Sequence, residues 1–154
     1  MEIGVATDFS GNVYVAGFID SLPDLFVVKY NSSGAEQWTQ QLVSSGDDRA
    51  RGVATDSSGN VYVAGYTKGG LDGNSNSGNR DAFVVKYNSS GTKQWTKQHG
   101  TSNANVQWGE GGVATDSSGN VYVTGITKGG LDGNTSAGDY DIYLVKYNSS
   151  GTKQ

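Results

Sequence analysis

The chain has 154 residues, of which 34% are hydrophobic and none is cysteine, and its net charge is −4 at pH 7. This acidity argues against nucleic acid or an anionic membrane surface as a partner, because both require a basic face. The lack of cysteine excludes disulfides and thiolate metal sites, and no apolar run is long enough to predict insertion into a membrane.

The pentapeptide Gly-Val-Ala-Thr-Asp begins three successive copies of one longer sequence, at Gly4, Gly52 and Gly112. The copies are therefore 48 and 60 residues apart, which fits a four-stranded propeller blade better than a helical repeat. One such unit cannot bury its own apolar faces, so the copies must stack to form a core. The expected blades are residues 1–51, 52–111 and 112–154.

Four segments within the repeat have the composition of short strands. The Gly-Val-Ala-Thr-Asp segment, with its small side chains, is expected to be innermost, and Val-Tyr-Val follows after a Ser-Gly-Asn turn. A third apolar segment and an outer strand with Trp38 or Trp95 complete the unit. The apolar runs do not alternate with polar residues, so both faces should be covered. The sequence thus predicts an all-β fold of four-stranded antiparallel blades, with these two Trp side chains packed between outer strands.

The segments GVATDSSGNVYVAG, from residue 52, and DAFVVKYNSSGTKQW, from residue 81, resemble the bacterial SBBP-type β-propeller repeat. That family occurs in large secreted or cell-surface proteins, and its repeats are scaffolds without shared catalytic residues. The resemblance therefore implies a propeller scaffold from a secreted or cell-surface parent protein. The sequence has no charged-plus-apolar leader, so we expect that a signal peptide of such a parent has been removed.

Three blades are too few for a ring, because closed propellers usually have four to eight. The third copy stops at Gln154, where the other copies continue to Trp38 and Trp95, so it should lack most of its outer strand. Two chains would form a six-bladed ring through head-to-tail contacts, and three chains would form nine blades. We expect the homodimer, formed by a fragment of a larger repeat protein. Alternatively, a segment of a partner chain completes the third blade.

Differences between the copies are concentrated in the loops after the second strand and in the connections between blades, which share one side of the disc. A binding site for a glycan or a surface protein is expected on that side. Its candidate residues are Lys68, Arg80, Trp108 and Tyr140.

The long loops also carry oxygen-bearing side chains at alternate positions, an arrangement that could bind Ca²⁺ with its six to eight oxygen ligands. The candidate ligands are Asp72, Asn74, Asn76, Asp132 and Asn134. The interpretation that we favour is Asx turns, in which the side chain binds nearby backbone groups. A second set of carboxylates lies at the end of the first strand of each copy. These aspartates could form an acidic ring around a central channel, or each could cap the turn that follows its strand. This set consists of Asp8, Asp56 and Asp116.

No residue in the sequence is predicted to be catalytic. Acid–base catalysis needs groups in unequal environments, and near-identical copies supply equivalent residues. His99 is the one histidine, and no nucleophile motif lies near it. We therefore expect a non-enzymatic scaffold and assembly module that needs no cofactor. An adhesin-like module that binds a glycan or a protein is the alternative, and a glycoside hydrolase with carboxylates from different blades is the third interpretation.

Overall fold

The computed structural model contains three antiparallel sheets, and it describes residues 3–19, 22–100, 105–106 and 112–154. The first sheet, which we call blade 1, has its four strands in sequential order. Its strands are β1 (Gly4–Thr7), β2 (Val13–Ile19), β3 (Leu22–Tyr30) and β4 (Glu36–Leu42). The all-β prediction and the order of strands within the repeat are confirmed here.

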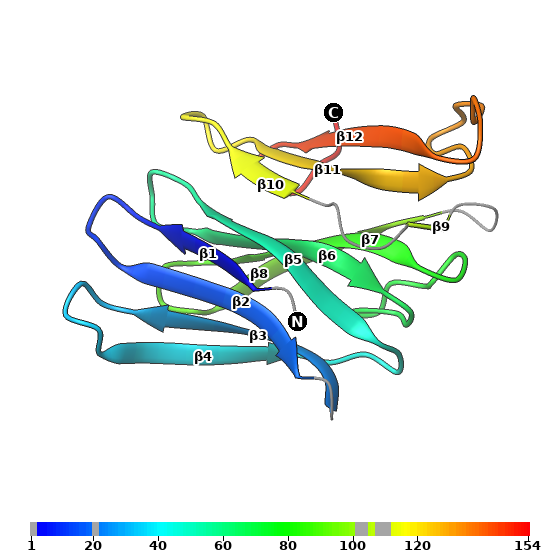
Figure 1. Ribbon diagram of the computed structural model, residues 1–154. Helices are drawn as coiled ribbons and strands as arrows, with labels where there is room; N and C mark the ends of the chain where they lie inside the picture. Colours follow the sequence, from blue (N-terminus) through cyan, green and yellow to red (C-terminus); the bar gives the residue numbers. More distant parts are fainter. Residues whose placement is uncertain (1–2, 20–21, 101–104, 107–111) are drawn as a thin grey trace.

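Blade 2 has the same order, and its strands are β5 (Asp48–Thr55), β6 (Val61–Thr67), β7 (Asp81–Tyr87) and β8 (Lys93–His99). Blade 3 consists of β10 (Gly112–Thr115), β11 (Val121–Lys128) and β12 (Asp141–Tyr147), with the two-residue β9 (Asn105–Val106) paired to β11. The three sheets lie one above another with blade 2 in the middle (Figure 1). Among the described residues, no helix has the length and apolarity needed to cross a membrane.

The first strand of blade 2 begins earlier than the sequence predicted. β5 starts at Asp48 and continues through an irregularity between Ala50 and Gly52, so the expected boundary at residue 52 falls inside a strand. In blade 3, β9 and β10 lie at the corresponding places along β11. The repeated pentapeptide marks only the part of the strand that all copies share, which is why its start did not mark the blade boundary.

The turn from the first to the second strand is closed by an aspartate in every blade. Asp8 Oδ1 accepts hydrogen bonds from the backbone N–H groups of Ser10 (2.9 Å) and Asn12 (3.0 Å), and Oδ2 accepts one from the Tyr14 hydroxyl (2.9 Å). Gly11, at φ 76°, supplies the left-handed residue that this turn requires. Asp56 and Asp116 make the same contacts, so all three aspartates cap turns.

Two clusters of buried side chains fill the spaces between the blades. The cluster between blades 1 and 2 combines Tyr14, Ala16, Leu25, Val27 and Leu42 with Ala50, Val61, Val63, Leu71, Phe83, Val85 and Tyr87. The cluster between blades 2 and 3 combines Tyr62, Ala64, Tyr66, Ala82 and Val84 with Val121, Val123, Leu131, Tyr143, Val145 and Tyr147. Blade 2 is therefore covered on both faces, as its uninterrupted apolar strands predicted, and every residue of β7 is buried.

Candidate functional site

The residues proposed to bind a glycan or protein differ widely in their surroundings. Lys68 is exposed, and its Nζ lies 3.5 Å from Asp47 Oδ2. Arg80 is only 8% exposed, and its guanidinium lies 5.0 Å from the centre of the Tyr66 ring, inside the boundary between blades 2 and 3. Arg80 therefore packs against a tyrosine of its own blade and is largely inaccessible to a ligand.

The other two candidates lie further along the chain. Tyr140 is 59% exposed, and Lys128 Nζ is 5.7 Å from the centre of its ring, so this residue is available at the surface of blade 3. Trp108 lies outside the described residues. The structure thus places an exposed lysine, a buried arginine and an exposed tyrosine in three different settings.

The aspartates proposed as calcium ligands form ion pairs with lysines of their own blades, and Asp132 also contacts the preceding blade. Asp72 binds the side chains of Lys93 and Thr96 on β8. Burial acts to raise its pKa, but these two hydrogen bonds and the positive charge of Lys93 together outweigh burial, and the pKa lies below its usual value. Asp132 binds Lys153, and its Oδ2 lies 3.1 Å from His99 Nε2. Both aspartates have positive φ values, 50° and 57°, as residues in tight turns do.

The asparagines proposed as calcium ligands point their amide groups at backbone carbonyls. Asn74 Nδ2 donates to Leu71 O (2.7 Å), and Asn134 Nδ2 donates to Leu131 O (3.0 Å). Asn76 Nδ2 donates to Lys68 O (2.7 Å). Within the described part of the chain, no group of three or more His, Cys, Asp or Glu side chains is placed to hold a metal ion. The three asparagine amides thus bind nearby backbone groups, whereas Asp72 and Asp132 bind side chains.

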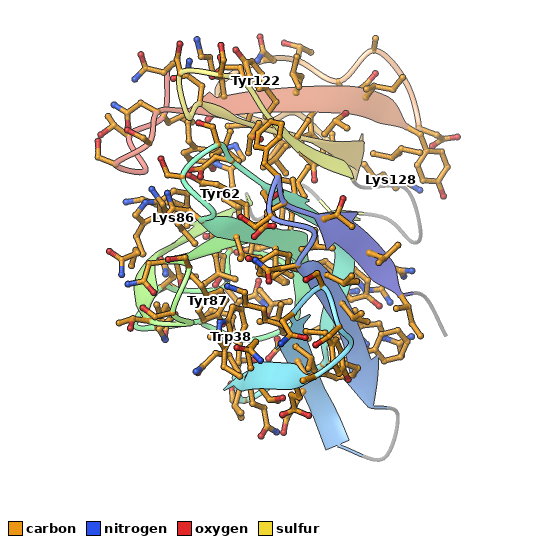
Figure 2. The ribbon with its side chains drawn as sticks, turned by 90° about the vertical axis from the view of Figure 1, so that its left-hand side faces the viewer. Trp38, Tyr62, Lys86, Tyr87, Tyr122 and Lys128 are labelled. Carbon is orange, nitrogen blue, oxygen red and sulfur yellow. The ribbon has the colours of Figure 1, made fainter. Side chains whose placement is uncertain are left out.

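A repeated set of contacts joins each blade to the next. Trp38 lies between two tyrosines, with ring centroids 6.0 Å from Tyr14 of its own blade and 6.3 Å from Tyr87 of blade 2. Its Nε1 donates a hydrogen bond to Ser89 O (3.2 Å), and Lys29 Nζ donates to the same carbonyl (3.0 Å). Figure 2 shows Trp38 beside Tyr87. One carbonyl in the turn of blade 2 thus receives two donors from blade 1.

Blades 2 and 3 repeat this arrangement. Trp95 lies between Tyr62 (6.0 Å) and Tyr147 (6.3 Å), and Trp95 Nε1 donates to Ser149 O (3.2 Å). Lys86 Nζ donates to the same oxygen (2.9 Å) and lies over the Tyr62 ring, beside which Figure 2 shows it. The two boundaries have one geometry, so each blade carries a face for the preceding blade and a different face for the following one.

The innermost strands add a second repeated contact. Thr55 Oγ1 donates to Thr7 O (2.9 Å), and Thr115 Oγ1 donates to Thr55 O (2.8 Å). Each blade therefore offers a threonine hydroxyl to the blade before it and a threonine carbonyl to the blade after it.

The following face of blade 3 is uncovered. Ile142 is 84% exposed and Leu144 is 68% exposed, whereas the corresponding residues of blade 2, Ala82 and Val84, are 3% and 1% exposed. Lys146 Nζ lies 5.6 Å from the centre of the Tyr122 ring, as Lys86 does over Tyr62. Blade 3 therefore presents the apolar residues and the lysine that blade 2 uses to hold its neighbour.

The preceding face of blade 1 is uncovered as well. Val5 is 68% exposed, and Val13, Val15 and Phe26 are half-buried. Their counterparts Val61, Val63 and Phe83 in blade 2 are at most 1% exposed. The two ends of the stack thus expose the sequence equivalents of two faces that are buried inside the chain. The sequence predicted exposed apolar faces on the outer blades. It did not predict that a Lys and a Trp donate to one shared carbonyl, because that acceptor lies 50 to 60 residues away along the chain.

Comparison with known families gives a match to one model, the SBBP β-propeller repeat, at residues 37–72 and 94–132. No curated protein matches the sequence. Each matched segment begins in the outer strand of one blade and ends in the loop after the second strand of the next blade. The unit of the family model therefore spans a blade boundary and includes the tryptophan of the repeated interface.

Proposed function

Because the chain belongs to the SBBP β-propeller repeat family, we propose that it is a non-enzymatic scaffold module that assembles with itself head to tail. The observation that carries this proposal is the pair of uncovered outer faces. The outer face of blade 3 corresponds to the face of blade 2 that packs on blade 3, and the outer face of blade 1 corresponds to the face of blade 2 that packs on blade 1. Inside the chain, faces of these two kinds pack against each other.

The free energy of this assembly comes from apolar burial. Exposed Ile142 and Leu144 would become covered by the valines and Phe26 of a second chain, as Ala82 and Val84 are covered by blade 3. Burying a Leu or Ile side chain contributes roughly 1.5–3 kcal/mol. Exposed apolar faces of this kind are typical of surfaces that bind a protein.

Polar contacts fix the register of the assembly. If the new interface repeats the contacts inside the chain, Lys146 Nζ donates to Ser32 O of the second chain. Lys29 and Lys86 donate in the same way to the corresponding carbonyls of Ser89 and Ser149. In the same way, Thr7 Oγ1 donates to the partner's Thr115 O. The Lys146 and Thr7 donors lose contact with water when the chains associate, and each new hydrogen bond contributes about 1 kcal/mol to the free energy of association.

A head-to-tail contact generates a ring when the rotation closes and a filament when it does not. Three blades per chain make two chains sufficient for a six-bladed ring, inside the usual range of four to eight. We therefore propose a homodimer as the functional form, with a trimer of nine blades as the less compact alternative.

Cross-linking tests the direction of assembly, because the chain has no cysteine of its own. Ser10 and Ser89 line one small cavity between the turns of blades 1 and 2, and their counterparts across the proposed interface are Ser118 and Ser32. Chains with Ser118→Cys are mixed with chains with Ser32→Cys and treated with a short bismaleimide. We expect a covalent dimer in the mixture and none with either variant alone.

The single variants are the internal control. A head-to-tail dimer places its two Ser32 residues on opposite interfaces, so Ser32→Cys chains cannot cross-link to each other. A covalent dimer of Ser32→Cys chains alone would indicate a head-to-head contact and contradict the proposal. The absence from the mixture of a product that contains one chain of each variant would contradict it as well.

A further inference from the structure

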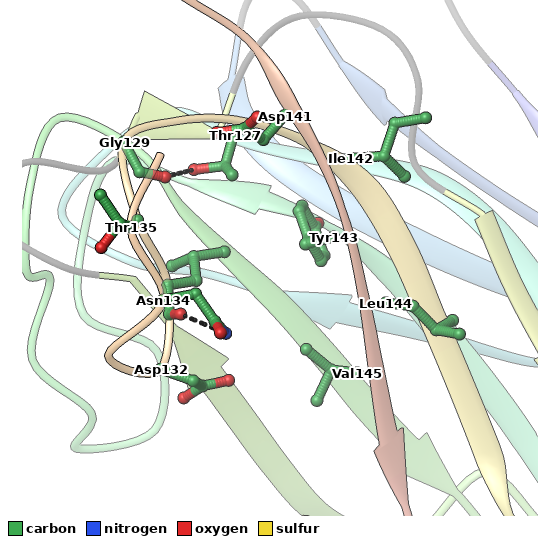
Figure 3. Close-up of a pocket in the computed structure, with 12 residues that line it drawn as sticks. Thr127, Gly129, Asp132, Asn134, Thr135, Asp141, Ile142, Tyr143, Leu144 and Val145 are labelled. Atoms are coloured by element: carbon green, nitrogen blue, oxygen red, sulfur yellow. Dashed lines mark hydrogen bonds between the residues drawn. The ribbon is translucent and has the colours of Figure 1, made fainter. Parts of the chain in front are cut away.

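The outer edge of blade 3 contains a cavity of about 320 Å³. It lies between β12 and the loop that follows β11, and its lining includes Gly129, Leu131 and Asp132 on the loop side. Figure 3 shows Tyr143, Leu144 and Val145 along the strand, with Asn134 and Thr135 across from them. The cavity is therefore open along a strand edge and closed by a loop.

In blade 2, β8 occupies the same place. Gln98 pairs with Phe83 of β7, the counterpart of Tyr143. Its Oε1 accepts a hydrogen bond from Leu71 N (3.0 Å), and its Nε2 donates to Gly69 O (3.1 Å) and Asp81 Oδ2 (3.0 Å). One glutamine side chain thus joins the outer strand to the loop and to the start of β7.

The loop of blade 3 repeats two internal hydrogen bonds of the blade 2 loop without such a glutamine. Asn134 binds Leu131 O as Asn74 binds Leu71 O. Asp141 Oδ2 accepts a hydrogen bond from Ala137 N (3.1 Å), the counterpart of the bond from Ser77 N to Asp81 Oδ2. The residues that correspond to the partners of Gln98 all line the cavity, and they are Gly129, Leu131, Thr135 and Asp141. The receptor for a glutamine is preformed, which lowers the entropic cost of binding.

The strand edge beside this cavity is open. Tyr147 bridges to Lys153, and Gln154 N donates to Lys146 O (2.9 Å), so these contacts start an outer strand at one end of β12. Among the described residues, no strand pairs with the outer side of β12 from Asp141 to Val145. An unpaired edge presents backbone N–H and C=O groups that another strand can bind.

We propose that this edge and cavity bind an extended peptide segment of a partner polypeptide with the pattern Trp-Thr-x-Gln, which adds to blade 3 as its outer strand. In the register of β8, the tryptophan lies opposite Lys146, the threonine opposite Val145 and the glutamine opposite Tyr143. Backbone hydrogen bonds supply affinity and the glutamine pocket supplies specificity, as in other cases of β-strand addition. This site adjoins the outer face of blade 3, because Ile142 and Leu144 also line the cavity and the added tryptophan corresponds to Trp95, which lies between two blades.

The probe is a fluorescent synthetic peptide with the sequence of Trp95–Gly100, added to the complete chain and followed by fluorescence anisotropy. We expect saturable binding, and at least tenfold weaker binding for the same peptide with Gln98→Ala, because the loop groups would then stay buried without their partners. A scrambled peptide of the same composition is expected not to bind. Equal dissociation constants for the glutamine and alanine peptides, or no saturable binding at millimolar concentration, would overturn the proposal.

A variant chain locates the bound peptide. Adding the six residues Trp-Thr-Lys-Gln-His-Gly after Gln154 should fill the edge from the same chain, at a high effective concentration. This extended chain should no longer bind the free peptide. If it binds the peptide as tightly as the original chain does, the peptide lies elsewhere and the proposed site is wrong.

Discussion

Strands β7 and β12 differ in only three of seven residues, but one is wholly buried and the other is largely open on one face. Val84 is 1% exposed and its counterpart Leu144 is 68% exposed. The apolar pattern of a blade therefore predicts that a neighbour exists, and the position of the blade in the stack decides whether that neighbour belongs to the same chain. Blade 3 keeps the apolar pattern of an inner blade at the end of the stack.

The largest contrast is expected from a charge at these two positions. Val84→Glu should destabilise the fold by about 4 kcal/mol or more, because it buries an unpaired charge. Leu144→Glu should leave the monomer folded and abolish dimerisation, since the side chain reaches water in the separate chain. Thermal unfolding by circular dichroism measures the first effect, and sedimentation measures the second. A dimeric Leu144→Glu chain would contradict the proposed interface.

The tryptophans between blades are expected to have the next largest effect. Trp95→Ala removes the ring between Tyr62 and Tyr147 and should lower the free energy of unfolding by about 2 kcal/mol, less than for a fully buried Trp. Trp38→Ala should have the same effect within about 0.5 kcal/mol, because its contacts are the same. Urea unfolding of both variants checks this equality. A much smaller effect of one variant would show that the two boundaries are not equivalent.

Substitution of Lys86 is expected to affect folding and substitution of Lys146 to affect dimerisation, both by smaller amounts than the changes above. Lys86→Met should lower the unfolding free energy by about 1 kcal/mol, because Lys86 donates to Ser149 O inside the chain. Lys146→Met should leave monomer stability unchanged and weaken the dimer about fivefold to tenfold, through loss of the bond to the partner chain. Comparison of unfolding curves with dissociation constants tests this. Equal destabilisation of the monomer by both variants would remove Lys146 from the interface.

The smallest effect concerns pH. Hydrogen bonds from the side chain and backbone of Asn120, with those from Tyr122 and Ser118, hold the pKa of Asp116 at about 2. The pKa of an aspartate in the unfolded chain is about 3.9. The ionised carboxylate therefore stabilises the fold above about pH 4, and this stabilisation is lost as the pH falls from about 4 to about 2. Asp116→Asn should show a shallower decline of melting temperature in this range, whereas Asp139→Asn, an exposed loop control, should follow the original chain.

The repeat alone predicted much of the fold, because strand composition and turn residues are local properties. Val61–Thr67 and Asp81–Tyr87 became strands as expected, and Asp8 became a turn cap. The extension of β5 to Asp48 was missed because only one blade carries that sequence. The burial of Arg80 was missed for another reason, since the Tyr66 ring that covers it comes from a neighbouring strand.

The role of the proposed calcium-binding loops could not be predicted from their own sequence. Alternating oxygens are compatible with both a cation site and a turn, and the choice depends on distant partners. Asp72 reaches Lys93 and Thr96, more than twenty residues away, and Asp132 reaches His99 of the preceding blade. The contacts of Asp72 follow from the pairing of strands within blade 2 and that of Asp132 with His99 follows from blade stacking, so spacing within the loop could not predict them.

The central claim is that the outer faces of blades 1 and 3 bind each other, and the mass of the chain in solution tests it most directly. Light scattering coupled to size-exclusion chromatography, over a range of dilution, should give about 32 kDa, twice the 16.1 kDa of one chain. A folded monomer at all concentrations would contradict the claim, because the exposed apolar faces would then be stable in water without a partner.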